Sequence, residues 1–224
     1  MTAGATSAIS HTAEGITVLG KSLFERGLTF GRTGNISIRD GDRILVTPTG
    51  GSLGFLHPDD LSVIDLTGRH VEGPKPSKEA FLHAAVYRSR PAANAVVHLH
   101  STYSVAISLL ADLDPADLLP PLTAYYVMRV GSLPLVPYHA PGDQSLEPLA
   151  EKVAARHHAF LLANHGPVVA GADLAAAADA AEELEETARL YLLLQGHRTR
   201  PLTPEQAAKL RPSTVAAVPD KPAS

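Results

Sequence analysis

The stretch AVVHLH, residues 95–100, places two histidines at the end of an apolar run. Successive side chains of a β-strand alternate between its faces, so His98 and His100 share one face with Val96. The run predicts a buried strand over residues 95–100, and two imidazoles on one face can both reach a zinc ion, about 2.0–2.1 Å from each nitrogen. A His-x-His pair alone is weak evidence, because two histidines on a half-exposed strand face are the more frequent explanation.

A further histidine follows apolar residues in LLANHGPVVAG, residues 161–171. This pattern predicts a strand that ends at His165 and a turn on Gly166 and Pro167. Catalytic zinc sites typically keep three protein ligands and one open position, so His98, His100 and His165 would suffice. Taken alone, His165 is equally well explained as a turn residue bonded to nearby backbone. Seven other histidines lack such a placement, and we expect them on the surface or in packing: His57, His70, His83, His139, His157, His158 and His197.

The length and composition predict one globular domain. The chain has 224 residues, of which 45% are apolar and 19% charged. These values are close to the average of folded proteins. We expect a single domain over residues 13–211, with loose tails at residues 1–12 and 212–224, where small and polar residues or prolines offer little to bury.

Composition also excludes several functions. The chain has no cysteine, so disulfides, thiolate nucleophiles and cysteine-ligated zinc are excluded, and His, Asp or Glu must hold any metal. The net charge of -4, without a Lys/Arg cluster, argues against a nucleic-acid partner. The N-terminus lacks a basic and apolar leader, and no stretch reaches the length of a membrane span. We therefore expect a cytoplasmic protein without a membrane partner.

Helical and strand patterns alternate along the chain, which predicts an α+β or three-layer arrangement with a mixed or antiparallel sheet. We expect helices at residues 14–26, from a cap at Ser77 to Arg90, at 101–110, and from a cap at Asp173 to Gly196. We expect strands at residues 35–40, 43–48, 95–100, 133–138 and 159–164, with the first two forming a hairpin around Gly41 and Asp42.

Polar loops and one acid supply further candidate groups. Glu79 is expected in the first turn of the helix that begins at Ser77, where an isolated glutamate is most often a solvated residue near the helix dipole. The stretches TGN (33–35), TPTGG (47–51) and PSK (76–78) offer backbone N–H groups, hydroxyls and one ammonium. Such groups can hold a phosphate, although each stretch alone is only turn chemistry.

Together, GNISIR, VTPTG, a Pro-Ser-Lys-Glu helix start, VVHLH and NHG, in this order, resemble the class II aldolase/adducin family over residues 16–210. The resemblance implies a three-layer α/β/α fold with a mainly antiparallel central sheet. It also implies a homotetramer with active sites at the subunit interfaces.

The resemblance implies roles for individual residues. His98, His100 and His165 would hold one zinc ion, and Glu79 would be the acid/base and, when substrate is absent, a further metal ligand. A tyrosine acid from a neighbouring subunit would be Tyr125 or Tyr126, which the sequence does not separate. The phosphate of a substrate would bind at Gly34, Asn35, Thr49, Gly50, Ser77 and Lys78. Fuculose-phosphate aldolases have a second serine in place of Lys78, and a cation there also suits a substrate with an extra carboxylate.

Within the family, the strings KSLFERGLTFGRTGNISIRD, LVTPTGGSLGFL, LPPLTAYYVMRVGSLPLVPY and AEELEETARLYLLL resemble most the branch that decarboxylates 3-oxo-tetronate 4-phosphate. That reaction, part of carbohydrate metabolism, yields dihydroxyacetone phosphate and carbon dioxide through a zinc-stabilised enediolate. Two alternatives stay open. One is a sugar-phosphate aldolase or 4-epimerase, and the other is a non-catalytic adducin-like module, which the retained Glu79 and histidines disfavour.

Overall fold

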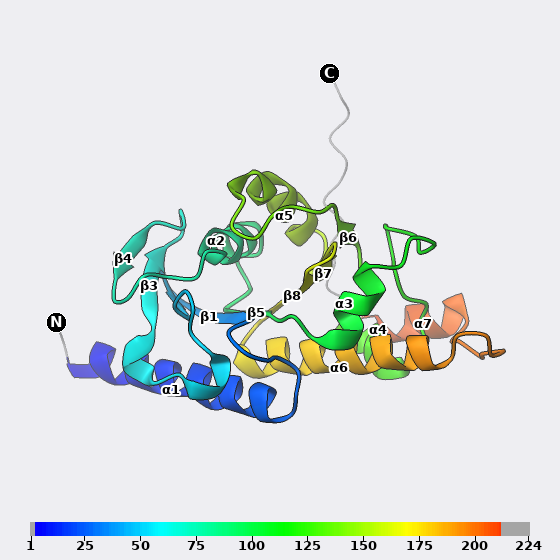
Figure 1. Ribbon diagram of the computed structural model, residues 1–224, viewed down its shortest axis with the longest axis horizontal. Helices are drawn as coiled ribbons and strands as arrows, with labels where there is room; N and C mark the ends of the chain where they lie inside the picture. Colours follow the sequence, from blue (N-terminus) through cyan, green and yellow to red (C-terminus); the bar gives the residue numbers. More distant parts are fainter. Residues whose placement is uncertain (1–2, 212–224) are drawn as a thin grey trace, which may run out of the picture.

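One mainly antiparallel sheet forms the centre of the protein (Figure 1). The computed structural model describes residues 3–211, and residues 3–11 by their backbone alone. Within these residues the strand order is β4-β3-β2-β1-β5-β8-β7-β6, and β6 beside β7 is the parallel pair. The strands are β1 (Asn35–Asp40), β2 (Arg43–Val46), β3 (Ser62–Asp65), β4 (His70–Glu72), β5 (Ala95–His98), β6 (Leu135–Val136), β7 (Ala159–Leu162) and β8 (Gly166–Gly171).

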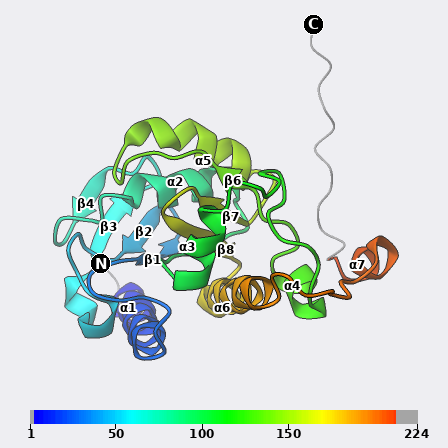
Figure 2. The ribbon, with the colours of Figure 1, turned by 45° about the vertical axis from the view of Figure 1, so that its right-hand side comes forward.

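Helices cover both faces of the sheet and complete the three expected layers. Helices α2 (Ala80–Ser89) and α5 (Glu147–Ala154) lie on one face, and α1 (Ala3–Glu25) and α6 (Leu174–Leu193) lie on the other, as Figures 1 and 2 both show. The shorter helices are α3 (Thr102–Ser108), α4 (Ala124–Arg129) and α7 (Pro204–Leu210), with 3-10 turns at Leu53–Phe55, Pro58–Asp60 and Gln144–Leu146. No helix in the described part of the chain combines the length and apolarity needed to cross a membrane.

Strand alternation divides the core into two halves. On the central strand β5, Val97 belongs to the apolar cluster under α1 and α6, and Val96 belongs to the cluster under α2 and α5. Both side chains are fully buried. A fully buried valine contributes about 1.5–3 kcal/mol of stabilisation relative to an exposed one. His98 follows the direction of Val96 and therefore lies on the α2 side of the sheet.

The ends of several elements differ from the sequence-based expectation. Helix α1 begins at Ala3, so most of the expected loose tail 1–12 is helical; alanines favour helix and no proline interrupts them. Residues 1–2 and the expected tail 212–224 lie outside the described residues. The prediction of Asp173 as a cap is confirmed, because its carboxylate accepts a hydrogen bond from Ala176 N at 2.8 Å.

Ser77 is not the cap of α2, contrary to the prediction. Ser77 N donates to Thr47 O at 3.1 Å, and Thr49 N donates to Lys75 O at 3.0 Å. This pairing keeps residues 75–77 extended, so α2 begins only at Ala80 and Glu79 occupies the capping position. The pairing also brings two of the polar loops named above side by side.

Gly166 sits where the start of β8 passes the end of β5. A Cβ at this position would collide with the carbonyl oxygen of Leu99 and would lie 3.3 Å from the Cα of His100. Only glycine permits this approach, which holds the segment carrying His100 against the turn carrying His165.

Gly166→Ala should therefore push the 99–100 segment away from β8. We expect a loss of about 2 kcal/mol or more in the free energy of unfolding, and a reduced content of bound divalent metal. Thermal unfolding and metal analysis of the purified variant measure both. Gly15→Ala is the matched control: its Cβ would meet Leu174 Cδ2 at an ordinary 3.5 Å, and alanine favours helix. Equal behaviour of the two variants would contradict this account.

Candidate metal centre

In the neutral form of its ring, His98 presents a proton-free nitrogen to the interior of the protein. Its side chain is fully buried, and Nδ1 lies 2.8 Å from the carbonyl oxygen of Pro167. A carbonyl only accepts, so Nδ1 carries the proton of the neutral ring and Nε2 keeps its lone pair. Nε2 has no hydrogen-bond partner in the described part of the chain, and it lies 3.3 Å from Oε2 of Glu79. A buried acceptor without a donor is costly unless a cation or a proton occupies the space before it.

His100 and His165 meet from two chain segments. Strand β5 ends at His98, so His100 lies two residues beyond the strand and not within it as predicted. The predicted turn on Gly166 and Pro167 is also wrong, because both residues belong to β8. Leu162 pairs with Gly166, and Asn164 between them adopts a left-handed φ of 58°, so the turn itself carries His165. The Nε2 atoms of His100 and His165 lie 3.1 Å apart.

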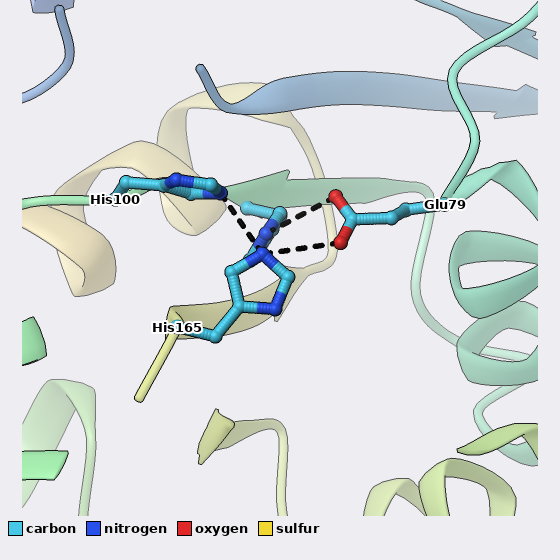
Figure 3. Close-up of side chains that lie close together, drawn as sticks. Glu79, His100 and His165 are labelled. Atoms are coloured by element: carbon cyan, nitrogen blue, oxygen red, sulfur yellow. Dashed lines mark hydrogen bonds and ion pairs between the residues drawn. The ribbon is translucent and has the colours of Figure 1, made fainter. Parts of the chain in front are cut away.

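Glu79 completes the group, as Figure 3 shows. Its Oε1 lies 3.1 Å from His165 Nε2, and its Oε2 lies 3.3 Å from His98 Nε2. Asn35 Nδ2 donates a hydrogen bond to Oε2 at 2.9 Å. The carboxylate therefore reaches the centre from the start of α2, opposite the three histidines.

The geometry fits one divalent cation. One ligand atom from each of Glu79, His98, His100 and His165 lies within 4.8 Å of the others. Ligands about 2.0–2.1 Å from a tetrahedral zinc ion lie about 3.4 Å from one another. The separations of 3.1 and 3.3 Å between Glu79 and two histidines are close to this value. Three imidazoles and a carboxylate form a donor set that suits zinc and related divalent ions.

Burial and neighbouring charges tune the ligands. Burial, together with positive charge at His98, lowers the pKa of His100 to about 3 and that of His165 to about 4, so both rings are neutral at pH 7. Burial opposes ionisation of Glu79, but a protonated His98 outweighs burial through its charge and a hydrogen bond from Nε2, and it holds the pKa of this carboxyl below its usual range. Burial opposes protonation of His98, but the Glu79 carboxylate outweighs it and raises the pKa of that ring. A cation at the centre competes with that proton.

The predicted phosphate-binding residues line one cavity beside the centre. This cavity, of about 300 Å³, is also lined by Glu79, His100 and His165. It contains all six predicted residues: Gly34, Asn35, Thr49, Gly50, Ser77 and Lys78. Gly34 and Gly50 have φ values of 79° and 70°, a conformation that turns their loops sharply. The amide side chain of Asn35 donates to Glu79, so this residue joins the cavity to the metal centre.

Further residues of the site were not predicted from the sequence. Arg32 lines the phosphate-side cavity with an exposed side chain. A second cavity of about 460 Å³, lined by Phe30 and Tyr138, shares His100 and His165 with the first. Arg32 could have been found as the cation that flanks the Thr33–Asn35 loop, whereas Phe30 and Tyr138 had no local signal.

The two candidate tyrosines are absent from the lining of both cavities at the metal centre. They belong to α4, whose Arg129 lines a third cavity together with Gly171. Tyr126 is 1% exposed, whereas Tyr125 is 58% exposed, with Arg129 above its ring at 5.5 Å. Neither tyrosine lines the two cavities at the metal centre.

Comparison with known proteins agrees with this fold. Residues 14–192 match the family described as the Class II Aldolase and Adducin N-terminal domain, and the chain belongs to this family.

Individual relatives agree with the family assignment. A Haemophilus influenzae protein named 3-oxo-tetronate 4-phosphate decarboxylase is 51% identical over 193 residues, which cover 86% of this chain and 92% of the relative. An L-fuculose phosphate aldolase from Methanocaldococcus jannaschii is 38% identical and covers 77% of this chain and 91% of its own. A crystal structure of YgbL from Klebsiella pneumoniae, described as a candidate aldolase, epimerase or decarboxylase, superposes with a TM-score of 0.88 at 46% identity, covering 91% of this chain and 99% of the other.

The purified protein should contain about one divalent ion per chain. His98→Ala and His165→Ala should each lose most of it, because two imidazoles bind a metal far more weakly than three. Elemental analysis after dialysis against a weak chelator measures the content. His197→Ala, an exposed histidine elsewhere, is the control and should keep its metal. Full retention in both centre variants would show that the ion binds elsewhere.

Proposed function

We propose that this protein is a zinc-dependent carboxy-lyase that converts 3-oxo-tetronate 4-phosphate to dihydroxyacetone phosphate and carbon dioxide. The observation that carries the proposal is the His98–His100–His165–Glu79 group at the edge of a cavity with two cationic side chains. The curated relatives that are 44–51% identical share the decarboxylase name, which supports the same substrate. A soluble metabolic enzyme of this kind would work in the cytoplasm.

The substrate is a 3-oxo acid, whose bond to the carboxylate breaks because the neighbouring ketone accepts the electrons left at C2. When bound, a divalent ion supplies Lewis-acid stabilisation of the negative charge that develops on the substrate oxygens. The protein therefore needs to orient the substrate, hold its phosphate and supply one proton.

The polar cavity supplies the phosphate site. Backbone N–H groups of the loops at Gly34 and Gly50, with the hydroxyls of Thr49 and Ser77, offer hydrogen bonds to phosphate oxygens. Lys78 adds positive charge, and Arg32 brings a second cation to the same cavity. Two cations suit a substrate that carries both a phosphate and a carboxylate. A sugar phosphate without a carboxylate requires only one cation, for its phosphate.

Glu79 is placed for proton transfer. Its carboxylate is ionised, so it accepts a proton before it donates one. We assign it the transfer of a proton from the C2 hydroxyl to C2 after carbon dioxide has left. A second proton donor must then restore that hydroxyl.

Tyr125 from a second copy of the chain is the assigned second donor. Its exposed ring can enter the site of a neighbour, and it lines neither cavity at the metal centre of its own chain. Burial raises the pKa of Tyr126, and its hydroxyl is enclosed. The proposed assembly is a homotetramer in which each site uses residues of two subunits.

Incubation with 3-oxo-tetronate 4-phosphate should release carbon dioxide and dihydroxyacetone phosphate, which a coupled nicotinamide-dependent reductase detects. Glu79→Gln should lower kcat by about 100-fold or more while the variant keeps its fold, because the amide cannot accept the proton. The unphosphorylated acid should react far more slowly, since its remote binding energy is missing.

Release of no carbon dioxide from either C2 epimer, together with cleavage or epimerisation of a ketose phosphate, would replace this proposal by the aldolase or epimerase alternative.

Mixing Glu79→Gln with Tyr125→Phe tests the shared site. Each variant alone should be nearly inactive, but subunit exchange should restore about a quarter of wild-type activity, the share of sites that random pairing makes intact. Activity is measured after mild dissociation and reassembly of the mixture. Tyr126→Phe is the control and should stay active, because its buried hydroxyl has no hydrogen-bond partner in the described residues. A fully active Tyr125→Phe, or a fully active monomer in light scattering, would contradict the shared site.

A further inference from the structure

Three buried polar side chains behind Glu79 have no part in the metal centre or its cavities. Ser37, His83 and Tyr87 are all 0% exposed. The sequence suggested only surface or packing roles for histidines outside the metal-ligand set. Buried polar groups are costly unless they are hydrogen-bonded, so a polar cluster at this depth requires partners.

The spacing of these residues brings them onto facing surfaces. Glu79, His83 and Tyr87 follow one another at intervals of four along the start and length of α2, which places them on one side of the helix. Asn35 and Ser37 are two residues apart on β1 and therefore share one face of the strand. That face lies opposite to Ile36, whose side chain packs in the core under α1 and α6.

A continuous chain of hydrogen bonds links them to Glu79. Asn35 Nδ2 lies 2.9 Å from Glu79 Oε2, and Asn35 Oδ1 lies 2.5 Å from His83 Nε2. His83 Nδ1 lies 2.7 Å from Ser37 Oγ, which lies 2.8 Å from the hydroxyl of Tyr87.

The carboxylate defines the direction of every bond in this chain. An ionised Glu79 only accepts, so the amide of Asn35 must turn its NH2 group to Oε2 and its carbonyl to His83. His83 must then donate from Nε2 and accept at Nδ1 from the hydroxyl of Ser37. The hydroxyl of Tyr87 in turn donates toward Ser37, where it lies 2.8 Å from Oγ and 3.0 Å from the backbone oxygen. Each polar atom of the imidazole is used once.

The neutral ring is the form that this arrangement needs. Burial lowers the pKa of His83 to about 3, so the ring has one donor and one acceptor at neutral pH. A protonated ring would have two donors and would confront the hydroxyl proton of Ser37.

We infer that His83 is a positioning residue for the proton-transfer step: it fixes the amide of Asn35, and Asn35 holds the carboxylate of Glu79 at the metal centre. Without the donor on His83, the amide can rotate and present its oxygen to the carboxylate, which would repel it. The inference rests on the proposed role of Glu79 in proton transfer. It adds a residue that touches neither substrate nor metal.

Two polar substitutions separate this role from simple packing. His83→Gln can place an N–H group where Nε2 lies and keep the bond to Asn35. His83→Asn is shorter, reaches only the position of Nδ1 and leaves Asn35 without its donor. Both should keep one divalent ion per chain. We expect His83→Asn to lower kcat by about 10- to 100-fold with KM changed by less than about threefold, and His83→Gln to stay within about threefold of wild type.

A double variant supplies a readout that a structural role would not change. With Glu79→Gln already present, His83→Asn should reduce kcat by less than about twofold further, because no carboxylate is left to position. Crystal structures of the two His83 variants give a readout independent of turnover. The Glu79 carboxylate should leave its place beside His98 and His165 in His83→Asn and should keep it in His83→Gln.

An unmoved carboxylate with full kcat in His83→Asn would overturn the inference. So would an equal loss of activity in the presence and absence of Glu79, or equal defects in the Asn and Gln variants. Failure of the proposed function is a different result, because wild-type protein would then release no carbon dioxide, while the crystal structures would still decide whether His83 positions Glu79.

Discussion

The arrangement of this protein depends on one buried carboxylate that is kept ionised among three imidazoles. Taking a charge out of water costs several kcal/mol unless opposite charge and hydrogen bonds replace the water. For Glu79, the replacements are a hydrogen bond from Asn35 Nδ2 and the positive charge, a proton or a divalent cation, between the carboxylate and the Nε2 atoms of His98 and His165. These partners come from β1, from β5 and from the turn before β8, so the group can form only when the central strands are paired in the observed register.

Each ligand is held by backbone geometry close to it. His98 is held by the carbonyl of Pro167, which belongs to the neighbouring strand β8. His100 and His165 are brought together by the close approach that Gly166 permits. Glu79 lies at the start of α2 because the extended pairing of residues 75–77 with 47–49 delays the helix. Rigid strand ends and helix starts therefore determine the relative positions of the ligands, and the polar loops that line the adjacent cavity follow from the same pairing.

Sequence patterns predicted much of this arrangement. Alternation along residues 95–100 indicated that His98 would emerge from a buried strand, and the layers and the mainly antiparallel sheet agree with the expectation. The predicted bounds of helices and strands were less accurate where contacts between distant segments of the chain determine them. The pairing that displaces Ser77 from the cap of α2 joins segments almost 30 residues apart, and no local pattern records it. The short strands β3 and β4 and helices α4, α5 and α7 were also not predicted, because their apolar periodicity is brief. His83 was expected in packing or on the surface, although its spacing of four from Glu79 and Tyr87 was visible in the sequence. The sequence did not show that this side of α2 would pack against β1.

The central claim is that the four convergent side chains hold a single divalent cation, and anomalous X-ray diffraction above and below the zinc absorption edge tests it most directly. The account predicts one anomalous peak per chain, about 2.0–2.2 Å from the Nε2 atoms of His98, His100 and His165, with Glu79 beside it in the substrate-free protein. Crystals of metal-loaded protein that show no peak among these nitrogens, or a peak held by other side chains, would contradict it.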